Sequence, residues 1–300
     1  CLRNDNNLIL NPPHASWLGC DWIKDAEQTI ECVDDLNLKW MIVDHYAIDS
    51  RWETMLKSYS EKLLIIDDLA DRAHDCNQLI DQTLNRQFND YKNLVPDKCK
   101  LFLGSDYTII RSEFLKLRKY SLERRKNNIV NKLLINMGGT DKDNCTSEIL
   151  KVLKDIDLPQ DFVIIIVLGG NSPWINEVKS IASSLRWKTE IKVNVTNMAK
   201  IMSDSDFAIG AAGITAWERC CMGLPSILVL LASNQIYVAN ALESRGAIIL
   251  IRNKDQIPKY LAPAINSLLT NKELRTNISK SASQVTDGTG VDKLILEMGL

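Results

Sequence analysis

The segment from Phe207 to Glu218 combines residue types that suit a phosphorylated ligand. An apolar stretch that ends at Ile209 predicts a short strand, and the small residues that follow predict a turn into a helix near Gly213. Small residues let a backbone approach a ligand closely, and a helix N-terminus carries partial positive charge. The segment therefore favours a phosphate or diphosphate at Gly213, with Glu218 able to accept hydrogen bonds from sugar hydroxyls. A turn that serves packing alone would have the same composition.

Four further predicted strands of the C-terminal half are also followed by glycine or small polar residues. In doubly wound folds, ligands bind beyond the carboxyl ends of the strands. One such turn carries little information, whereas five at one edge favour a polar ligand over coincidence. The four turns occupy residues 137–141, 169–172, 194–198 and 231–235.

Polar groups follow two predicted strands of the N-terminal half as well. Residues 44–46 read Asp-His-Tyr and residues 67–68 read Asp-Asp. His45 and Tyr46 are candidate site residues, and the carboxylates that flank His74 in the sequence would favour its charged form. A surface or supporting position outside the site would account for each histidine equally well.

The alternation of apolar strands and helices predicts an α/β protein with parallel sheets, and 300 residues are enough for two domains. A basic stretch at 116–126, which we interpret as a solvated helix end and linker, marks the boundary between domains at 1–122 and 130–300. Six strands are predicted in the second domain and fewer in the first. The six strands are 132–136, 162–168, 191–193, 207–209, 226–230 and 247–250.

Composition excludes several classes of protein. The net charge of −2 gives no general attraction to nucleic acid or to an anionic membrane. The longest apolar run, 162–168, is of strand length and not of membrane-spanning length. We therefore expect a cytoplasmic protein without a membrane span or a nucleic-acid partner. A monomer is the expected state, although the sequence does not reveal the oligomeric state.

Metal and dinucleotide motifs are missing from the sequence. Its eight cysteines form no C-x-x-C pair, and its three histidines are too few for a zinc site of the usual spacing. Neither a G-x-G-x-x-G fingerprint after a strand nor a P-loop is present. We therefore expect reduced thiols, no metal and no cofactor.

Several blocks together resemble one family, the UDP-2,4-diacetamido-2,4,6-trideoxy-β-L-altropyranose hydrolases, called PseG. The likeness covers nearly the whole chain in order, and its His-Tyr and Trp-Glu-Arg-Cys blocks are the most specific. The blocks are HASWLG at 14–19, Asp-Ala at 25–26, VDHYAID at 43–49, IDDLADR at 66–72, NMGGTD at 136–141, NMA at 197–199 and AGITAWERCCMGLP at 212–225.

The resemblance implies a GT-B fold similar to MurG, in which two Rossmann-like doubly wound domains face a cleft. It implies hydrolysis of a UDP-linked diacetamido sugar by water attack at the anomeric carbon, which releases UDP and the free sugar. That sugar is a precursor of pseudaminic acid, which is used on bacterial flagella and surface glycans. The family requires no metal.

The resemblance also assigns roles to particular residues. Tyr46 would lie at the reacting centre, and Glu218 would bind the uridine ribose. The diphosphate would contact Gly213, Ile214 and Thr215, the sugar would contact Asn234 and Gln235, and the nucleotide side of the cleft would be lined by Gly138, Gly139 and Asn197.

One departure from the family pattern concerns the general base. The family carries a catalytic histidine in a G-x-G-H-x-x-R loop after its first strand, and His14, His45 and His74 do not lie in such a pattern. We therefore expect a chain whose first domain lacks its first βα unit, together with the base. Two alternatives stay open, a GT-B glycosyltransferase that uses a UDP-sugar donor and a non-catalytic fragment that binds a UDP-sugar.

Overall fold

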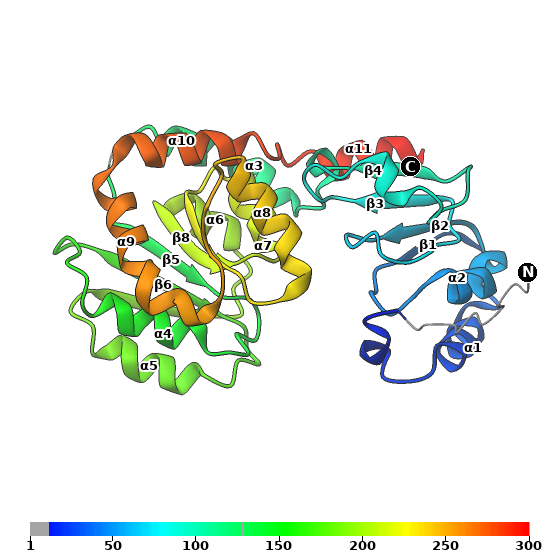
Figure 1. Ribbon diagram of the computed structural model, residues 1–300, viewed down its shortest axis with the longest axis horizontal. Helices are drawn as coiled ribbons and strands as arrows, with labels where there is room; N and C mark the ends of the chain where they lie inside the picture. The colour runs from blue at the N-terminus through cyan, green and yellow to red at the C-terminus, as the bar shows by residue number, and fades with distance from the viewer. Residues whose placement is uncertain (1–11, 128, 300) are drawn as a thin grey trace, which may run out of the picture. The chain divides into compact units, whose positions relative to one another are not determined.

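The computed structural model describes residues 12–127 and 129–299. Packing divides the chain into two compact units, Cys1–Tyr107 and Thr108–Leu300, which we call the N-terminal and the C-terminal unit. Each is an α/β unit built around one parallel sheet (Figure 1).

The N-terminal unit contains a four-stranded sheet in the order β1-β2-β3-β4, with all neighbouring strands parallel. The strands are β1 (Leu38–Val43), β2 (Ser60–Ile66), β3 (Gln78–Asp81) and β4 (Lys100–Leu103). The α-helices are α1 (Trp22–Val33) and α2 (Ser50–Leu56), and the 3₁₀ turns are η1 (Ala15–Leu18), η2 (Lys57–Tyr59), η3 (Phe88–Tyr91) and η4 (Ser105–Tyr107).

Both helices of this unit begin at an aspartate. The side chain of Asp21 accepts a hydrogen bond from the second residue of α1, and Asp49 does the same for α2, which satisfies donors that a helix start leaves open. Trp52 of α2 donates its indole N–H to Asp25 of α1 at 2.8 Å, so the two helices are joined. Their apolar sides cover one face of the sheet, where the core consists of Met41, Val43, Leu63, Ile65 and Leu79 with Ala26, Trp52 and Leu56.

The C-terminal unit contains a six-stranded parallel sheet in the order β10-β9-β8-β5-β6-β7. Its strands are β5 (Lys132–Asn136), β6 (Val163–Leu168), β7 (Lys188–Val193), β8 (Phe207–Ala211), β9 (Ser226–Val229) and β10 (Ile249–Ile251). Its helices are α3 (Ser112–Arg124), α4 (Cys145–Leu153), α5 (Ile175–Ser183), α6 (Met198–Asp204), α7 (Thr215–Cys221), α8 (Ile236–Ser244), α9 (Ile257–Thr270), α10 (Lys272–Ser283) and α11 (Gly290–Met298), with 3₁₀ turns η5 (Ser233–Gln235) and η6 (Lys254–Gln256).

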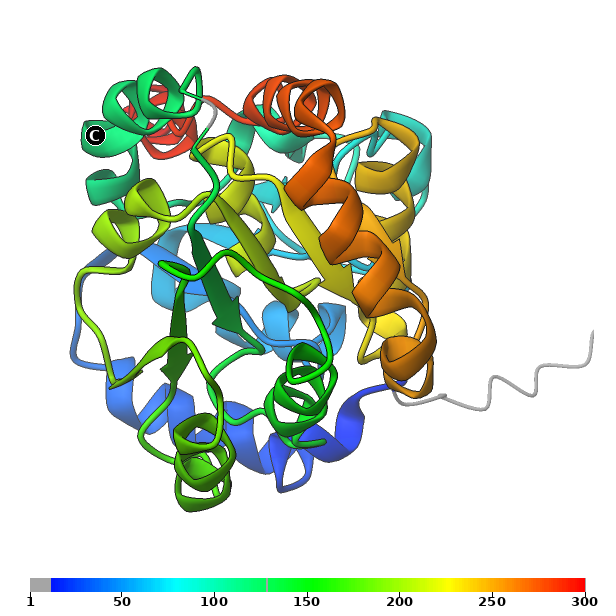
Figure 2. The same ribbon diagram turned by 90° about the vertical axis from the view of Figure 1, so that its left-hand side faces the viewer.

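Helices cover both faces of this sheet (Figures 1 and 2). Helices α4, α5 and α9 pack against the side chains of alternate strand residues such as Leu133, Ile135 and Ile209, which form the main core. Helices α3, α6 and α7 pack together on the other face. Burial on both faces explains why the central strands are continuous apolar runs. The predicted α/β class with two Rossmann-like domains is confirmed.

The boundary between the units lies before α3, whereas the sequence placed residues up to 122 in the first domain. Arginines of the basic stretch account for the difference, because they are not fully solvated. Arg118 donates to the carbonyl oxygens of Ser283 at 2.7 Å and Thr286 at 3.2 Å, and Arg125 donates to the carbonyl oxygen of Met202 at 3.0 Å. These bonds tie α3 to the C-terminal unit, so the interpretation of this stretch as a solvated linker is wrong for these arginines.

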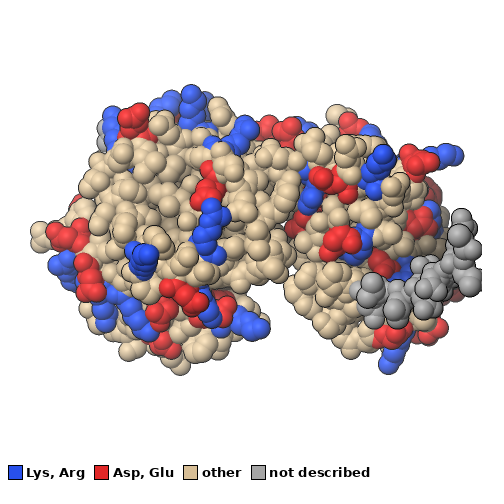
Figure 3. Space-filling view, viewed as in Figure 1, with Lys and Arg blue, Asp and Glu red and all other residues tan. Residues whose placement is uncertain are grey.

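The face of the molecule in Figure 3 shows acidic and basic side chains interspersed, without a large field of one sign. Within 12–127 and 129–299, none of the helices combines the length and the apolar character that crossing a membrane would need.

Candidate functional site

The C-terminal sheet reverses its winding between β5 and β8. These strands are neighbours in the sheet, with Asn136 opposite Gly210 at their carboxyl ends, while the chain leaves them toward helices on opposite faces. In open α/β sheets, ligands bind beyond this switch point. The turns that follow the two strands contain Gly138, Gly139 and Gly213, so the structure brings these three predicted residues to the same place in the fold.

The glycines of these turns differ in what surrounds them. Gly138 has a backbone φ of +95°, which favours glycine. A Cβ atom on Gly169 would lie 2.0 Å from the carbonyl oxygen of Gly139, so the turn after β6 packs directly on the turn after β5. A Cβ atom on Gly213 would meet nothing within 4 Å among the described residues. Packing therefore requires Gly169, whereas the backbone at Gly213 is open to a ligand.

Two helices begin beside the switch point, and only one has its N-terminus occupied by an acid. The carboxylate of Asp141 accepts hydrogen bonds from the N–H groups of Cys145 and Thr146, each at 2.9 Å, and so caps α4. In the described part of the chain, no side chain caps α7 after Gly213. An anion would meet a carboxylate at α4, so the turn at Gly213 is the better place for a diphosphate.

Glu218 lies in the first turn of α7 and is only 7% exposed. Burial raises the pKa of its carboxyl, and Arg111 opposes this shift through a hydrogen bond of 3.2 Å. Arg111 also pairs with Glu113 at 3.0 Å. Arg111 thus holds the Glu218 carboxylate in place, and this carboxylate can accept hydrogen bonds from ribose hydroxyls. Arg111 was not predicted as a site residue, because it precedes α3 and follows none of the predicted strands.

Arg219 lies beneath the same turn and is almost completely buried. Its guanidinium donates to the carbonyl oxygen of Ala211 at 2.5 Å and to the hydroxyl of Thr215 at 3.2 Å, and so joins the end of β8 to the start of α7. Burial lowers its pKa to about 10, which leaves it charged at neutral pH. A Cβ atom on Gly210 would lie 2.4 Å from this guanidinium. The sequence signals for this role were an arginine in a largely apolar helix and a glycine within the preceding strand.

The remaining predicted binding residues lie further along the same edge. Asn234 and Gln235 follow β9, the strand next to β8, and Gln235 accepts a hydrogen bond from the Leu231 N–H at 3.2 Å. Asn197 follows the edge strand β7 and begins α6. Among the described hydrogen bonds, none joins the Asn197 side chain to either glycine turn. Asn234 and Gln235 are thus near neighbours of the switch point in the sheet, whereas Asn197 is more remote.

The N-terminal sheet carries its polar residues at the corresponding edge. Tyr46 follows β1, and its hydroxyl donates to Asp68, which follows the adjacent strand β2, at 3.1 Å. The ring of Tyr46 lies 5.5 Å from the ring of His14 and 5.7 Å from the ring of Trp17. His45 accepts a hydrogen bond from the Ala47 N–H and thereby shapes the turn itself.

A buried network of charges lies behind this edge. Asp67 accepts hydrogen bonds from Arg72 and from the hydroxyl of Tyr91, both at 2.7 Å, and the same hydroxyl lies 2.9 Å from Asp81. His74 is buried, and its partner at 2.7 Å is Glu53 of α2. The carboxylates that flank His74 in the sequence pair with other cations instead.

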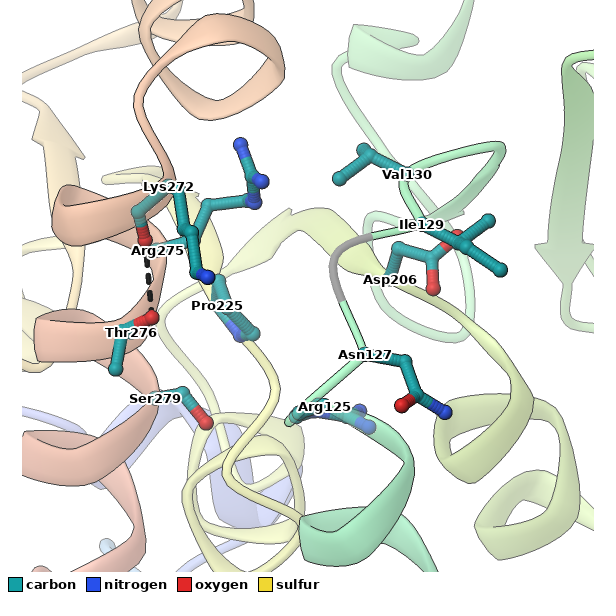
Figure 4. Close-up of a pocket in the computed structure, with 10 residues that line it drawn as sticks. All are labelled: Arg125, Asn127, Ile129, Val130, Asp206, Pro225, Lys272, Arg275, Thr276 and Ser279. Carbon is teal, nitrogen blue, oxygen red and sulfur yellow. Dashed lines mark hydrogen bonds between the residues drawn. The ribbon is translucent and has the colours of Figure 1, made fainter.

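A small cavity of about 30 Å³ lies elsewhere in the C-terminal unit (Figure 4). Its lining includes Ile129, Val130, Asp206 and Pro225, which precede β5, β8 and β9, so it lies at the amino ends of the strands. It is too small for a nucleotide and lies at the edge opposite the candidate site. Within the described residues, no group of three or more His, Cys, Asp or Glu side chains could hold a metal ion.

The two α/β units have a fold of the GT-B class. Its fold is similar to that of Acinetobacter baumannii MurG, with a TM-score of 0.66 at 15% identity over 92% of this chain and 76% of that one. Residues 133–290 match the family described as the glycosyltransferase family 28 C-terminal domain. This match covers more than half of the chain, and the chain belongs to that family.

The chain is also similar in sequence to individual curated proteins. The chain is 28% identical over 220 residues to an uncharacterized protein of Methanocaldococcus jannaschii, which covers 71% of this chain and 44% of the relative. It is 26% identical over 248 residues to the UDP-2,4-diacetamido-2,4,6-trideoxy-beta-L-altropyranose hydrolase of Campylobacter jejuni, over 82% of this chain and 85% of the hydrolase. The chain thus spans less than half of the archaeal relative and most of the hydrolase. The predicted likeness to PseG and MurG proteins is confirmed.

Proposed function

We propose that this protein hydrolyses UDP-2,4-diacetamido-2,4,6-trideoxy-β-L-altropyranose. Water attacks the anomeric carbon, and UDP and the free diacetamido sugar are released for pseudaminic acid biosynthesis, which supplies flagellin and surface glycans. One observation carries the proposal: two small-residue turns come together at the switch point, with the buried carboxylate of Glu218 behind them. The similarity to the Campylobacter hydrolase supports the choice of substrate.

In this proposal the C-terminal unit holds the UDP. The open backbone of Gly213, Ile214 and Thr215 donates to the diphosphate, and Glu218 accepts hydrogen bonds from the ribose. Arg219 supplies a fixed positive charge beneath the turn. Such prearranged dipoles stabilise the negative charge that develops on the diphosphate as the glycosidic bond breaks.

The N-terminal unit handles the sugar and the water. Tyr46 lies at its acid-lined edge, where the carboxylates would repel a diphosphate but not a neutral hexose. Because UDP is a good leaving group, the protein need not protonate it strongly. It must orient a water molecule and accept its proton, with no metal or cofactor taking part.

Product analysis tests the proposal directly. The full-length protein is incubated with the UDP-sugar, and the products are followed by ³¹P and ¹H NMR. We expect UDP and free reducing sugar in equal amounts, at the same rate whether or not a sugar acceptor is added. Failure to release UDP would overturn the proposal.

The family and the MurG fold favour a second candidate, a glycosyltransferase that uses a UDP-sugar donor. In that case, UDP release would require an acceptor and a new glycoside would form. A third reading, binding without turnover, predicts a measurable affinity for UDP and intact UDP-sugar after prolonged incubation.

A further inference from the structure

Two cysteines of the N-terminal unit lie with their sulfur atoms in contact. Cys76 precedes β3, Cys99 directly precedes the neighbouring strand β4, and their Sγ atoms are 3.6 Å apart. A disulfide bond is about 2 Å long, so small rotations of the two side chains would close it. The pair lies at the amino ends of the strands, opposite the edge of the same sheet that carries Tyr46.

Backbone hydrogen bonds hold the two cysteines beside each other. The ladder between β3 and β4 begins at the Lys100 N–H, which donates to the Asn77 carbonyl oxygen at 2.9 Å. Asn77 is joined in turn to β2, because its side chain accepts from the Leu63 N–H at 2.7 Å. On the other side, the Cys99 N–H donates to the Pro96 carbonyl oxygen at 2.8 Å. The contact between the sulfur atoms is therefore a consequence of the strand pairing.

The two thiols differ in how well a dissolved reagent can reach them. Cys76 is 2% exposed and belongs to the core of the unit, whereas Cys99 is half-buried and packs against that core from outside. A reagent therefore reaches Cys99 first, and Cys76 reacts with what has been added to Cys99. An accessible thiol beside a second, resolving thiol is the usual arrangement of cysteines that respond to oxidants.

The groups around the pair favour a thiolate at Cys99. A hydrogen bond from the Cys76 thiol lowers the pKa of Cys99, burial and Glu53 oppose this shift, and Lys57 adds to it, so that the net change is downward. The same hydrogen bond and burial raise the pKa of Cys76. Because the thiolate is the form that attacks an oxidant, Cys99 is the attacking sulfur and Cys76 keeps its proton for the second step.

We propose that Cys76 and Cys99 form an oxidation site, at which a peroxide converts the two thiols into a reversible disulfide. The Cys99 thiolate attacks a peroxide oxygen, the S–O bond forms as the O–O bond breaks, and hydroxide leaves. The Cys76 sulfur then attacks the Cys99 sulfur, the S–S bond forms as the S–O bond breaks, and the oxygen leaves as water with the Cys76 proton. Two electrons pass in all from the sulfur atoms to the peroxide. This site is independent of the proposed hydrolase activity.

Peptide mapping tests the site in the full-length protein. The protein is reduced, freed of reductant and treated with hydrogen peroxide, and the remaining thiols are alkylated. Trypsin cuts at Arg86 and Lys92, between the two cysteines, so mass spectrometry finds both in one species only if they are bonded. We expect this bonded pair to form about tenfold faster than the exposed thiols of Cys20 and Cys32 are oxidised, because oxidation follows thiolate character. Recovery of the pair as alkylated thiols while the exposed thiols are oxidised would overturn the inference.

Substitutions separate the roles of the two thiols. In Cys76→Ala the second thiol is missing, so we expect Cys99 to be trapped as a sulfenic acid that dimedone labels, and an unlabelled Cys99 would contradict its role as the attacking sulfur. The control Cys32→Ser removes an exposed thiol of α1 and should leave the Cys76–Cys99 bond unaffected. If Cys76→Ala does not fold, as judged by circular dichroism, Cys99→Ser replaces it. Peroxide should then leave Cys76 as a thiol, and its oxidation would overturn the proposed order of attack.

Reversal of the bond tests the accessible side of the pair. A dithiol reductant such as dithiothreitol attacks a disulfide sulfur through a mixed disulfide, and the half-buried Cys99 offers that sulfur. We therefore expect the oxidised, folded protein to regain both thiols on reduction without denaturant, as measured by alkylation and mass spectrometry. A bond that is reduced only after the protein is unfolded would contradict the proposal of a reversible site entered through Cys99.

Discussion

The two units use one α/β plan, but they present different chemistry at the carboxyl ends of their strands. The C-terminal edge offers backbone at Gly138 and Gly213, with Arg219 buried below. The N-terminal edge offers titratable side chains, including Tyr46 and Asp68. Backbone N–H groups and a fixed cation bind an anion, whereas hydrogen-bonded acids hold and move protons. The fold therefore sets where a ligand binds, and the residues at each edge set what is done there.

The largest expected effect tests whether the N-terminal edge depends on buried charge. Arg72→Met removes the 2.7 Å partner of the buried carboxylate Asp67, and we expect a loss of about 3–5 kcal/mol in unfolding free energy. The control Lys151→Met breaks an exposed pair with Glu148 in the C-terminal unit and should leave the free energy of unfolding almost unchanged. Urea unfolding of both variants measures the two losses in unfolding free energy. Equal losses would contradict the claim that the N-terminal edge depends on buried charge.

The pH dependence of stability tests the same edge through Asp68. Its folded-state pKa of about 6 is above the usual value, so its contribution to stability is full at low pH and is lost as pH rises through about 6. Asp68→Asn removes this dependence. Between about pH 4 and 7, the stability of the variant relative to wild type should rise by about 2–3 kcal/mol. The control Asp97→Asn, at an exposed position of the same unit, should show no such trend. If the difference in stability between Asp68→Asn and wild type does not change with pH, the raised pKa of Asp68 is refuted.

UDP affinity tests the C-terminal edge. Glu218→Ala removes the carboxylate that is proposed to accept hydrogen bonds from the ribose. We expect the Kd for UDP to rise about tenfold to a hundredfold, which is the range for loss of a hydrogen bond to a charged group. Glu148→Ala, at a half-exposed position on α4, is the control and should not change the Kd. Isothermal titration calorimetry measures both, and an unchanged Kd for Glu218→Ala would count against the ribose role.

The smallest expected effects concern two glycines at the carboxyl edge of the C-terminal sheet, Gly213 and Gly169. Gly213→Ala adds a methyl group to open space, so the stability should change by less than about 0.5 kcal/mol while UDP binding weakens severalfold. Gly169→Ala forces a Cβ atom onto the backbone of Gly139 and should cost about 1–3 kcal/mol of stability. Thermal unfolding and UDP titration of both variants test the distinction. Tight UDP binding by Gly213→Ala would contradict a close backbone approach there.

Much of the fold was predictable because buried parallel strands are continuous apolar runs, as 162–168 and 227–230 are. The start of β7 was missed because this edge strand opens on Lys188, Thr189 and Glu190, which are not apolar. The glycine turns were found from their positions after strands. Arg111 and the pair of His74 with Glu53 were not, because their partners are distant in sequence and only the folded chain brings them together.

The most direct test of the account is the position of bound UDP. Amide chemical shifts of the full-length protein are recorded during a UDP titration. The account predicts that the largest changes fall at Gly138, Gly213 and Glu218, with little change at Asp68. Changes concentrated at the N-terminal edge, or around the cavity beside Pro225, would contradict it.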